Sequence, residues 1–374
     1  MMFMEFRVIN KETYLMRYGK FLPKGGTIGF IAPSFGCATE PYITEFDSAI
    51  DKFIKMGYSV DIGPNCSSDQ GIGISNTPEK CGEEINEYFA SENNDVLISC
   101  GGGELMCQDL SFVDFDMIKE NPAKWFMGYS DNTNLTFLLP TLTDTAAIYG
   151  PCASSFGAEN WHESISDAMN VLTGDNLTIH AYDMWESTSL KDEEHPLVSY
   201  NLTEKHNVIS YIPGKSGLIR ISMIGSKNST NINNVDFSGR LIGGCLDCLG
   251  TLVGTRFDKA TEFCERYADD GIIWFFESCE LNTMSMRRYL WQLDQAGWFK
   301  NVKGFLIGRP FIYDQPLMGL DQYEAVLGIL RKYNVPVIMD LDIGHLPPMM
   351  TLIEGALADV SLSENDFQIK MKLI

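Results

Sequence analysis

Short apolar runs alternate with amphipathic segments in the first part of the chain. Residues 27–33 (TIGFIAP) end in a turn-prone Pro-Ser-Phe-Gly, which predicts a buried strand followed by a loop. Residues 40–56 carry apolar side chains at helical spacing, and residues 78–89 form an acidic helix that begins with proline. Strands separated by helices predict a parallel sheet covered on both faces. Further strands are predicted at 58–62, 95–100, 125–129 and 146–149, with a helix that reaches about residue 143 before the last of them.

The pattern changes in the middle of the chain. Residues 173–236 are rich in Asn, Ser and Lys, which predicts a polar linker with an insert. Beyond this segment new apolar runs appear, such as GIIWFFESCE and VPVIMDLDIGH, with helices predicted near 258–268 and 284–296. The chain closes with two segments that resemble edge strands of a small sheet. We therefore expect an N-terminal α/β domain at 1–172, the linker and insert at 173–236, and a C-terminal domain at 237–374.

Length and composition are typical of a two-domain globular protein. The chain has 374 residues, of which 45% are hydrophobic, and a formal net charge of −22. Nucleic acids and anionic membrane surfaces are bound by clusters of Lys and Arg, which this acidic chain lacks. We therefore expect neither as a partner. No apolar run approaches the roughly 18 residues of a membrane span, and the first residues do not resemble a signal peptide. The ten cysteines are scattered through apolar stretches, which favours a cytoplasmic protein with reduced thiols.

Three predicted strands end in residues suited to ligand binding. In parallel sheets, ligands are bound at the carboxyl ends of the strands. The first strand is followed by Ser34, the third runs into the glycines at 101–103, and the fourth runs into GYSDNTNL, which contains Ser130. A serine on a glycine-tipped turn between a strand and a helix is typical of a nucleophile, although the frame Gly-x-Ser-x-Asn differs from the familiar Gly-x-Ser-x-Gly. The alternative is that Ser130, Asp131 or Asn132 caps the next helix.

A serine nucleophile needs a base and a group that orients the base. Among the five histidines, His345 follows an apolar run at a strand end and is the candidate base, with a structural role as the alternative. The other four lie in polar surroundings, where solvated side chains are predicted. Glu277 ends the run IIWFF, where a carboxylate must be paired or hydrogen-bonded to stay charged. A buried salt bridge or a helix start is the alternative for Glu277, and Glu280 is a rival for the same role.

Backbone amides are the candidate donors for an oxyanion. The N–H of Asp131 would point where an oxyanion hole needs it, and the glycine run centred on Gly102 could supply the second donor. A phosphate cradle is the other use of such a run, but no Walker lysine or dinucleotide fingerprint accompanies it. The sequence offers no His-x-x-x-His or paired Cys-x-x-Cys site. We therefore expect neither a metal nor a cofactor.

Several segments, in order along nearly the whole chain, are similar to one known family. GTIGFIAPS, CGGGELM, GYSDNTNL, GRLIGGCLDCLGTLVGT, WFFESCELN and DIGHLPP resemble the LD-carboxypeptidase family of serine peptidases, which includes muramoyltetrapeptide carboxypeptidases and microcin C immunity proteins. The resemblance implies a Ser-Glu-His triad, which falls on Ser130, Glu277 and His345. It also implies an α/β fold: an N-terminal parallel-sheet (flavodoxin-like) domain with the nucleophile, and a smaller mixed α/β C-terminal domain. The active site would lie at their junction, usually in a homodimer.

We weigh three functions, of which the resemblance implies the first two. The first is a cytoplasmic, metal-independent serine carboxypeptidase that removes the terminal D-alanine of a murein tetrapeptide across an L,D bond. The second is an immunity-type hydrolase that cleaves an aminoacyl or peptidyl group from a nucleotide-like sulfamate or phosphoramidate, and GGCLDCLGTLVGT looks more like that branch. The third is a ligand-binding protein that retains the fold without turnover.

Two kinds of side chain are candidates for binding the substrate. Arg309 follows a predicted strand and could hold a terminal carboxylate, with a surface or interdomain salt bridge as the alternative. Immunity-type members are similar in having a longer connecting segment with aromatics that stack on an adenine. Here that segment contains Trp185, Tyr200 and Tyr211, for which core packing is the alternative. The expected partner is thus a small peptide or a peptidyl-nucleotide.

Overall fold

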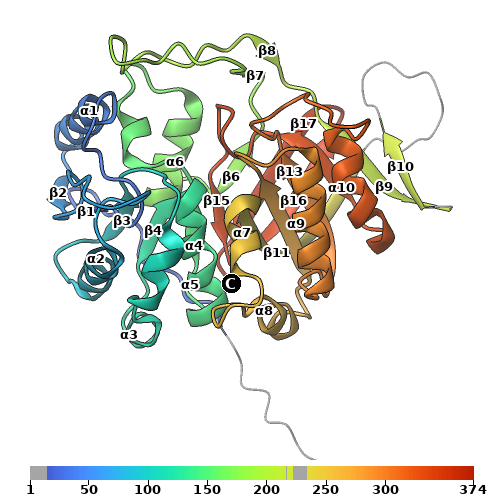
Figure 1. The fold of residues 1–374 in the computed structure, drawn as a ribbon, viewed down its shortest axis with the longest axis horizontal. Coiled ribbons are helices and arrows are strands. Elements are labelled where there is room, and N and C mark those ends of the chain that lie inside the picture. The colour runs from blue at the N-terminus through green and yellow to red at the C-terminus, as the bar shows by residue number, and fades with distance from the viewer. Residues whose placement is uncertain (1–14, 216, 222–233) are drawn as a thin grey trace, which may run out of the picture.

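The computed structural model describes residues 15–215, 217–221 and 234–374, which form two β-sheets with their helices and a separate strand pair (Figure 1). The N-terminal sheet has the order β15-β5-β4-β3-β1-β2. Its strands are β1 (Thr27–Ile31), β2 (Ser59–Ile62), β3 (Val96–Ser99), β4 (Trp125–Gly128), β5 (Ala147–Tyr149) and β15 (Leu352–Glu354). The helices of this part are α1 (Tyr42–Lys55), α2 (Pro78–Ala90), α3 (Phe115–Glu120), α4 (Thr133–Thr136), α5 (Leu138–Thr143) and α6 (Glu163–Thr173).

Strands β1 to β5 are parallel and follow the order 2-1-3-4-5, which is the flavodoxin-like arrangement. All five had been predicted from their apolar runs. Successive side chains enter opposite layers: Ile98 packs in the core that includes Phe53 of α1, and Leu97 packs in the core that includes Ile85 of α2. Because helices cover both faces of the sheet, a ligand is expected to bind outside the carboxyl ends of the strands.

The C-terminal sheet has nine strands among the described residues, in the order β10-β9-β14-β13-β12-β11-β16-β17-β6. The four central strands are parallel and the flanking strands are antiparallel. The strands are β6 (Thr178–His180), β9 (Ile209–Gly214), β10 (Gly217–Ile221), β11 (Asn234–Cys245), β12 (Ile272–Glu277), β13 (Val302–Gly308), β14 (Val337–Leu341), β16 (Leu357–Ser363) and β17 (Asp366–Lys372). The helices are α7 (Leu246–Leu252), α8 (Ala260–Arg266), α9 (Thr283–Gln295) and α10 (Gln322–Leu330).

The segment at 173–236, expected to be a polar linker and insert, contributes β6, β9 and β10 to the nine-stranded sheet. It also contains the separate pair β7 (Met184–Trp185) and β8 (Glu204–Lys205). Strand β10 at the end of the sheet is largely exposed, whereas the first four residues of its neighbour β9 are buried. The polar composition of the segment therefore hid strands that belong to the sheet.

The two halves of the chain exchange strands. β15, from the C-terminal half, pairs antiparallel with β5 at the edge of the N-terminal sheet. β6, which follows the N-terminal helices, pairs with β17 at the edge of the C-terminal sheet. Figure 1 shows β15 between the two parts of the molecule. The exchange brings the carboxyl end of β5 close to that of β12.

Among the described residues, none of the helices has the length and apolarity that crossing a membrane requires.

Candidate active site

Ser130 lies on a sharp bend directly after β4. It begins a short 3-10 helix (Ser130–Asn132) that leads into α4, and its φ of 62° lies in the left-handed region that residues with a side chain seldom adopt. Neither the 3-10 helix nor α4 has a side-chain cap hydrogen bond, so the capping alternative does not describe this turn. The bend instead raises the serine side chain at the end of the sheet, as in a nucleophile elbow.

The carboxylate of Asp131 holds this bend in place. It is buried, and it accepts hydrogen bonds from Ser34 Oγ at 2.7 Å, from the Met106 N–H at 2.9 Å and from Asn134 Nδ2 at 3.0 Å. Burial raises the pKa of Asp131, although these hydrogen bonds act in the opposite direction. The carboxylate therefore joins the turn after β4 to the segments that follow β1 and β3, through a serine hydroxyl in the first and a backbone N–H in the second.

The side chain of His345 lies between those of Ser130 and Glu277. Its Nε2 is 2.9 Å from Ser130 Oγ, and its Nδ1 is 2.8 Å from Glu277 Oε2. Glu277 is the last residue of β12 and His345 follows β14, so both come from the carboxyl ends of parallel strands. Glu280, the rival acid, is exposed, and its N–H bonds to Asp247. The three residues that the sequence predicted together are thus in hydrogen-bonding contact.

Burial and mutual attraction set the charges of the His345–Glu277 pair. Burial alone lowers the pKa of His345, but the neighbouring Glu277 carboxylate and hydrogen bonds with Glu277 and Cys279 outweigh it and raise the pKa above its usual range. Burial alone raises the pKa of Glu277, but the charge of His345 and hydrogen bonds from His345 and Tyr149 outweigh it and lower the pKa. The carboxylate therefore stays ionised although its side chain is fully buried.

Tyr149, the last residue of β5, is a member of the site that the sequence analysis missed. Its hydroxyl donates to Glu277 Oε1 at 2.6 Å and accepts from the Ser130 N–H at 3.4 Å. It therefore fixes the second oxygen of the carboxylate and contacts the turn that carries the serine. The available signal was its position at the end of a predicted parallel strand, where ligand-binding residues gather.

The two predicted oxyanion donors lie beside Ser130. A Cβ at Gly102 would be 3.2 Å from both Cβ and Oγ of Ser130, so the glycine backbone is packed closely against the serine. Within the described part of the chain, the N–H groups of Gly102 and Asp131 have no backbone acceptor. Both donors are therefore available for an oxygen atom next to the serine.

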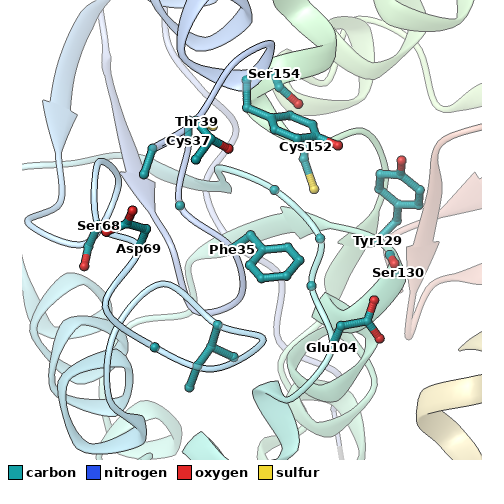
Figure 2. A pocket seen from close by; sticks show the side chains of 18 of the residues that line it. Phe35, Cys37, Thr39, Ser68, Asp69, Glu104, Tyr129, Ser130, Cys152 and Ser154 are labelled. Carbon is teal, nitrogen blue, oxygen red and sulfur yellow. The ribbon is translucent and has the colours of Figure 1, made fainter. Parts of the chain in front are cut away.

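Two cavities meet at Ser130, which lines both together with Gly103, Glu104 and Cys279. The first cavity has a volume of about 430 Å³ and contains aromatic and hydroxyl side chains; Figure 2 shows Ser130 and Tyr129 on one side of it and Ser68 and Asp69 on the other. The second has a volume of about 320 Å³, and we call it the acidic cavity after its lining residues Glu104, Asp131, Asp247 and Glu280. Among the described residues, no Lys or Arg lines either cavity.

The structure does not bring Arg309 and Trp185 to the serine. The guanidinium of Arg309 is buried, donates to the Asp340 carbonyl at 2.7 Å, forms an ion pair with Asp342 and lies 4.8 Å from the centre of the Trp185 ring. His206, expected to be solvated, is also buried and lies 3.3 Å from Asp342, so that expectation was wrong. The buried Asp342 carboxylate is thus the common partner of Arg309 and His206.

The other two aromatics of the connecting segment also lie away from Ser130. Tyr200 packs against His162 with ring centres 5.7 Å apart, and Tyr211 is a buried residue of β9. Neither lines the first cavity or the acidic cavity. The recognition of a nucleotide by these side chains therefore has no support in the geometry around the serine.

Comparison with known families gives matches to both halves of the chain. Residues 28–150 match the LD-carboxypeptidase N-terminal domain, and residues 238–360 match the LD-carboxypeptidase C-terminal domain. The chain belongs to the LD-carboxypeptidase family. The resemblance seen in the sequence motifs is thereby confirmed, and the two matched regions contain all three residues of the Ser130–His345–Glu277 contact.

Individual relatives within the family are distant but cover almost the whole chain. The microcin C7 self-immunity protein MccF of Escherichia coli is 24% identical over 357 residues, which are 93% of this chain and 94% of that protein. A putative carboxypeptidase of Treponema pallidum is 23% identical over 87% of both chains. The solved structure of MccF in complex with aspartyl sulfamoyl adenosine has a TM-score of 0.74 and 23% identity, covering 95% of this chain and 99% of that chain. These likenesses establish the mixed α/β fold.

Proposed function

We propose that the protein is a serine hydrolase in which Ser130 is the nucleophile, His345 the general base and Glu277 the group that orients the base. The observation that carries this proposal is the continuous contact from Ser130 Oγ through both ring nitrogens of His345 to the buried Glu277 carboxylate. Membership of the LD-carboxypeptidase family supports the same assignment. Within the described residues, the N–H groups of Asp131 and Gly102 have no backbone acceptor, so they are the candidate donors for the oxyanion of acyl transfer.

In the proposed reaction, His345 Nε2 accepts the proton of Ser130 while Oγ forms a bond to the substrate carbonyl carbon. The negative charge of Glu277 stabilises the imidazolium that results. The N–H groups of Asp131 and Gly102 donate to the oxyanion. Transfer of the proton from His345 to the leaving group breaks the scissile bond, and a water molecule activated by the same base releases the acyl group.

The substrate that we propose first is a murein-type peptide that loses its terminal D-alanine across an L,D bond. The family supports a carboxypeptidase, and the first cavity is large enough for a short peptide. Since no Lys or Arg among the described residues lines the cavities, the terminal carboxylate would be bound by hydroxyl groups and backbone N–H groups. The lining of the first cavity offers such hydroxyls on Thr39, Tyr42, Ser68 and Ser154. We further propose that the enzyme works in the cytoplasm, as a homodimer.

A second candidate is hydrolysis of the bond between an aminoacyl or peptidyl group and a nucleotide-like group. The observation that favours it is the set of similar structures, which includes MccF bound to aspartyl sulfamoyl adenosine and to glutamyl sulfamoyl guanosine. The absence of Trp185 and Arg309 from the lining of both cavities means that any nucleotide would be bound by other residues.

Two assays separate the candidates. Purified protein is incubated with a murein tetrapeptide and, separately, with an aminoacyl sulfamoyl adenosine, and the products are identified by mass spectrometry. Release of D-alanine alone supports the carboxypeptidase, and release of the sulfamoyl nucleoside alone supports the second candidate. If neither compound is cleaved and no acyl group becomes attached to Ser130, a binding protein without turnover is the better description.

The triad is tested by whether the losses of kcat in single and double variants are non-additive. Ser130→Ala and His345→Ala should each lower kcat by several orders of magnitude, and the double variant should lose little more, because the two side chains act as a unit. Glu277→Gln should lower kcat less than either of these substitutions. Glu280→Gln should lower kcat much less again, because Glu280 does not contact His345 in the described structure. Substantial activity in Ser130→Ala would show that the nucleophile has been assigned wrongly.

A further inference from the structure

The loop that carries His345 begins at Asp342, a buried acid that the proposed triad does not include. A hydrogen bond closes this loop at its base, where the Met350 N–H donates to the Asp342 carbonyl at 2.7 Å. The Asp342 side chain is 0% exposed and lies three residues before His345. The groups that hold Asp342 therefore affect where the imidazole of His345 stands.

Three groups from different parts of the chain hold the Asp342 carboxylate. Arg309, which follows β13, forms an ion pair with Oδ1. The Tyr182 N–H donates to Oδ2 at 2.9 Å, and His206 Nδ1 lies 3.3 Å from the same oxygen. Burial alone raises the pKa of Asp342, but the neighbouring side chains of His206 and Arg309 outweigh it and lower the pKa. The carboxylate is thus ionised, and both of its oxygens are bound.

Arg309 holds the end of β14 at several atoms. Its guanidinium donates to the Asp340 carbonyl at 2.7 Å and to the Asp342 carboxylate, which flank Leu341, the last residue of the strand. Its own N–H donates to the Leu341 carbonyl at 3.1 Å. The planar, five-donor guanidinium is suited to two acceptors in fixed positions, which a single ammonium group matches poorly.

The segment at 309–311 also contacts the two strand ends that carry the acid and the base. The Phe311 N–H donates at 2.9 Å to the carbonyl of Ser278, the neighbour of Glu277 in the sequence. The Phe311 ring packs against His345 with ring centres 6.5 Å apart. One short segment between the two strand ends is thus attached to both of them.

We propose that Arg309 and Asp342 are positioning residues, which hold the loop of His345 so that its imidazole stays between Ser130 and Glu277. The proposal rests on the hydrolase function proposed above. Neither Arg309 nor Asp342 lines the first cavity or the acidic cavity, so the pair acts on the base and not on the substrate. It follows that kcat depends on this ion pair and that KM does not.

The experiment separates positioning from stability. Arg309→Met leaves a buried carboxylate without its cation, whereas Arg309→Met combined with Asp342→Asn leaves no uncompensated charge. Stability in urea should therefore fall in the single variant and largely return in the double variant. Both variants should lower kcat by roughly 10-fold to 10²-fold and change KM by about twofold at most, because neither restores the donors to the end of β14. If the single variant does not fold, the double variant decides.

The control is a second buried pair of the same kind. Arg240 is 5% exposed, pairs with Asp270 at 2.6 Å, donates to the Gly355 carbonyl at 2.6 Å and lies 4.3 Å from the centre of the Tyr267 ring. It is paired with the first residue of β12, at the opposite end of that strand from Glu277. Arg240→Met, alone and combined with Asp270→Asn, should change stability in the same directions while kcat stays the same.

A second readout follows the base itself. The titratable groups that face or interact with His345 are Glu277, Cys279, Tyr129 and Glu104. The charge of Glu277 raises the pKa of His345, so an imidazole that moves away from it should titrate at lower pH. The pH–rate inflection and an NMR titration of the His345 ring, assigned by its loss in His345→Gln, should both shift down in the Arg309→Met, Asp342→Asn variant. Because this variant removes one charge of each sign, the shift reports the position of the ring.

The outcomes separate this inference from the proposed function. The murein tetrapeptide and the aminoacyl sulfamoyl adenosine serve as substrates. If the double variant regains kcat together with its stability, or if the control pair loses kcat to the same extent, the inference is overturned and the hydrolase stands. If the wild type cleaves neither compound, the hydrolase is overturned and the NMR titration decides. A pKa of His345 that falls in the double variant and not in the control supports the inference, and an unchanged pKa overturns it.

Discussion

At Ser130 the backbone occupies a conformation that costs on the order of 1–3 kcal/mol for a residue with a side chain. Hydrogen bonds on either side of it help to offset that cost, through the buried Asp131 carboxylate and the Tyr149 hydroxyl. Because Tyr149 also binds Glu277, one hydroxyl positions both ends of the proposed triad. The serine is thus held from two sides before a substrate arrives, as preorganised catalysis requires.

The pH dependence of the reaction should report the pair formed by His345 and Glu277. A base is active only when neutral, and the pKa of His345 is raised above its usual range, so kcat/KM should rise with pH through an inflection above about 6.5. Glu277→Gln removes the negative charge that raises the pKa of His345. The burial that remains lowers this pKa. The inflection of this variant should therefore move to lower pH in the pH–rate profile.

Glu87→Gln, which changes an exposed charge outside the site, is the control for this profile and should leave the inflection unchanged. An inflection in Glu277→Gln that stays in place or moves to higher pH would contradict the assignment of Glu277 as the partner of the base.

At the scale of elements, the loop after β14 depends on a glycine. Gly344 has a φ of 107°, and a Cβ there would lie 2.5 Å from Oε2 and 2.7 Å from Cβ of Glu277. Since the Cβ of Glu277 is fixed by its strand, Gly344→Ala must displace either the loop or the acid. Misplacement by about 1 Å can reduce the rate by roughly 10²-fold, so we expect kcat to fall by at least tenfold.

The matched control for Gly344→Ala is Gly57→Ala, at a φ of 93° with open space around the added methyl group. It should lower the free energy of unfolding by about 1–2 kcal/mol through backbone strain while kcat stays the same. Steady-state kinetics and urea unfolding of both variants make the comparison. Equal kcat in the two variants would show that the loop tolerates the methyl group.

Strand β15 carries a buried acid that destabilises the fold at neutral pH. Burial raises the pKa of Glu354 from 4.5 to about 8, so the folded state keeps it protonated while the unfolded state releases the proton. Its contribution to stability is fully present below pH 4.5 and is lost as the pH rises to about 8. Glu354→Gln should therefore raise the free energy of unfolding on the order of 2–3 kcal/mol at pH 7 relative to pH 4.5.

Urea unfolding of Glu354→Gln and the wild type at pH 4.5, 6 and 8 measures this difference. The gain in the variant should grow with pH over that window. A gain that is the same at all three values would mean that Glu354 is not protonated in the folded protein.

Local patterns predicted the elements that are buried on both faces and the residues at their ends. The strands up to Tyr149 and the contact among Ser130, His345 and Glu277 followed from apolar runs, strand ends and family motifs. β15 has only three residues and pairs with a strand about two hundred residues away, so no local period indicates it. The partner of Arg309 was missed for a related reason: the ion pair with Asp342 depends on how strands meet in space.

At the scale of the whole molecule, the exchanged strands β15 and β6 connect the two sheets, so we expect the sheets to unfold as one cooperative unit. Opening either half removes an edge strand from the other. We expect calorimetry to show a single thermal transition whose calorimetric and van't Hoff enthalpies agree, although the sequence length suggests two domains. Two resolved transitions would mean that the sheets unfold independently despite the exchange.

The pairing of β15 with β5 also determines when the molecule can assemble during its synthesis. Ser130 and β5 leave the ribosome about two hundred residues before His345 and β15. At ~5–20 residues per second, the delay is roughly ten to forty seconds. In this interval the nascent chain has the proposed nucleophile without the proposed base, and a hydrogen-bonding edge at β5 without its partner strand. On the proposed mechanism the growing chain is inert until His345 has been added, and the same interval is when its open edge is most exposed to pairing with a neighbouring chain.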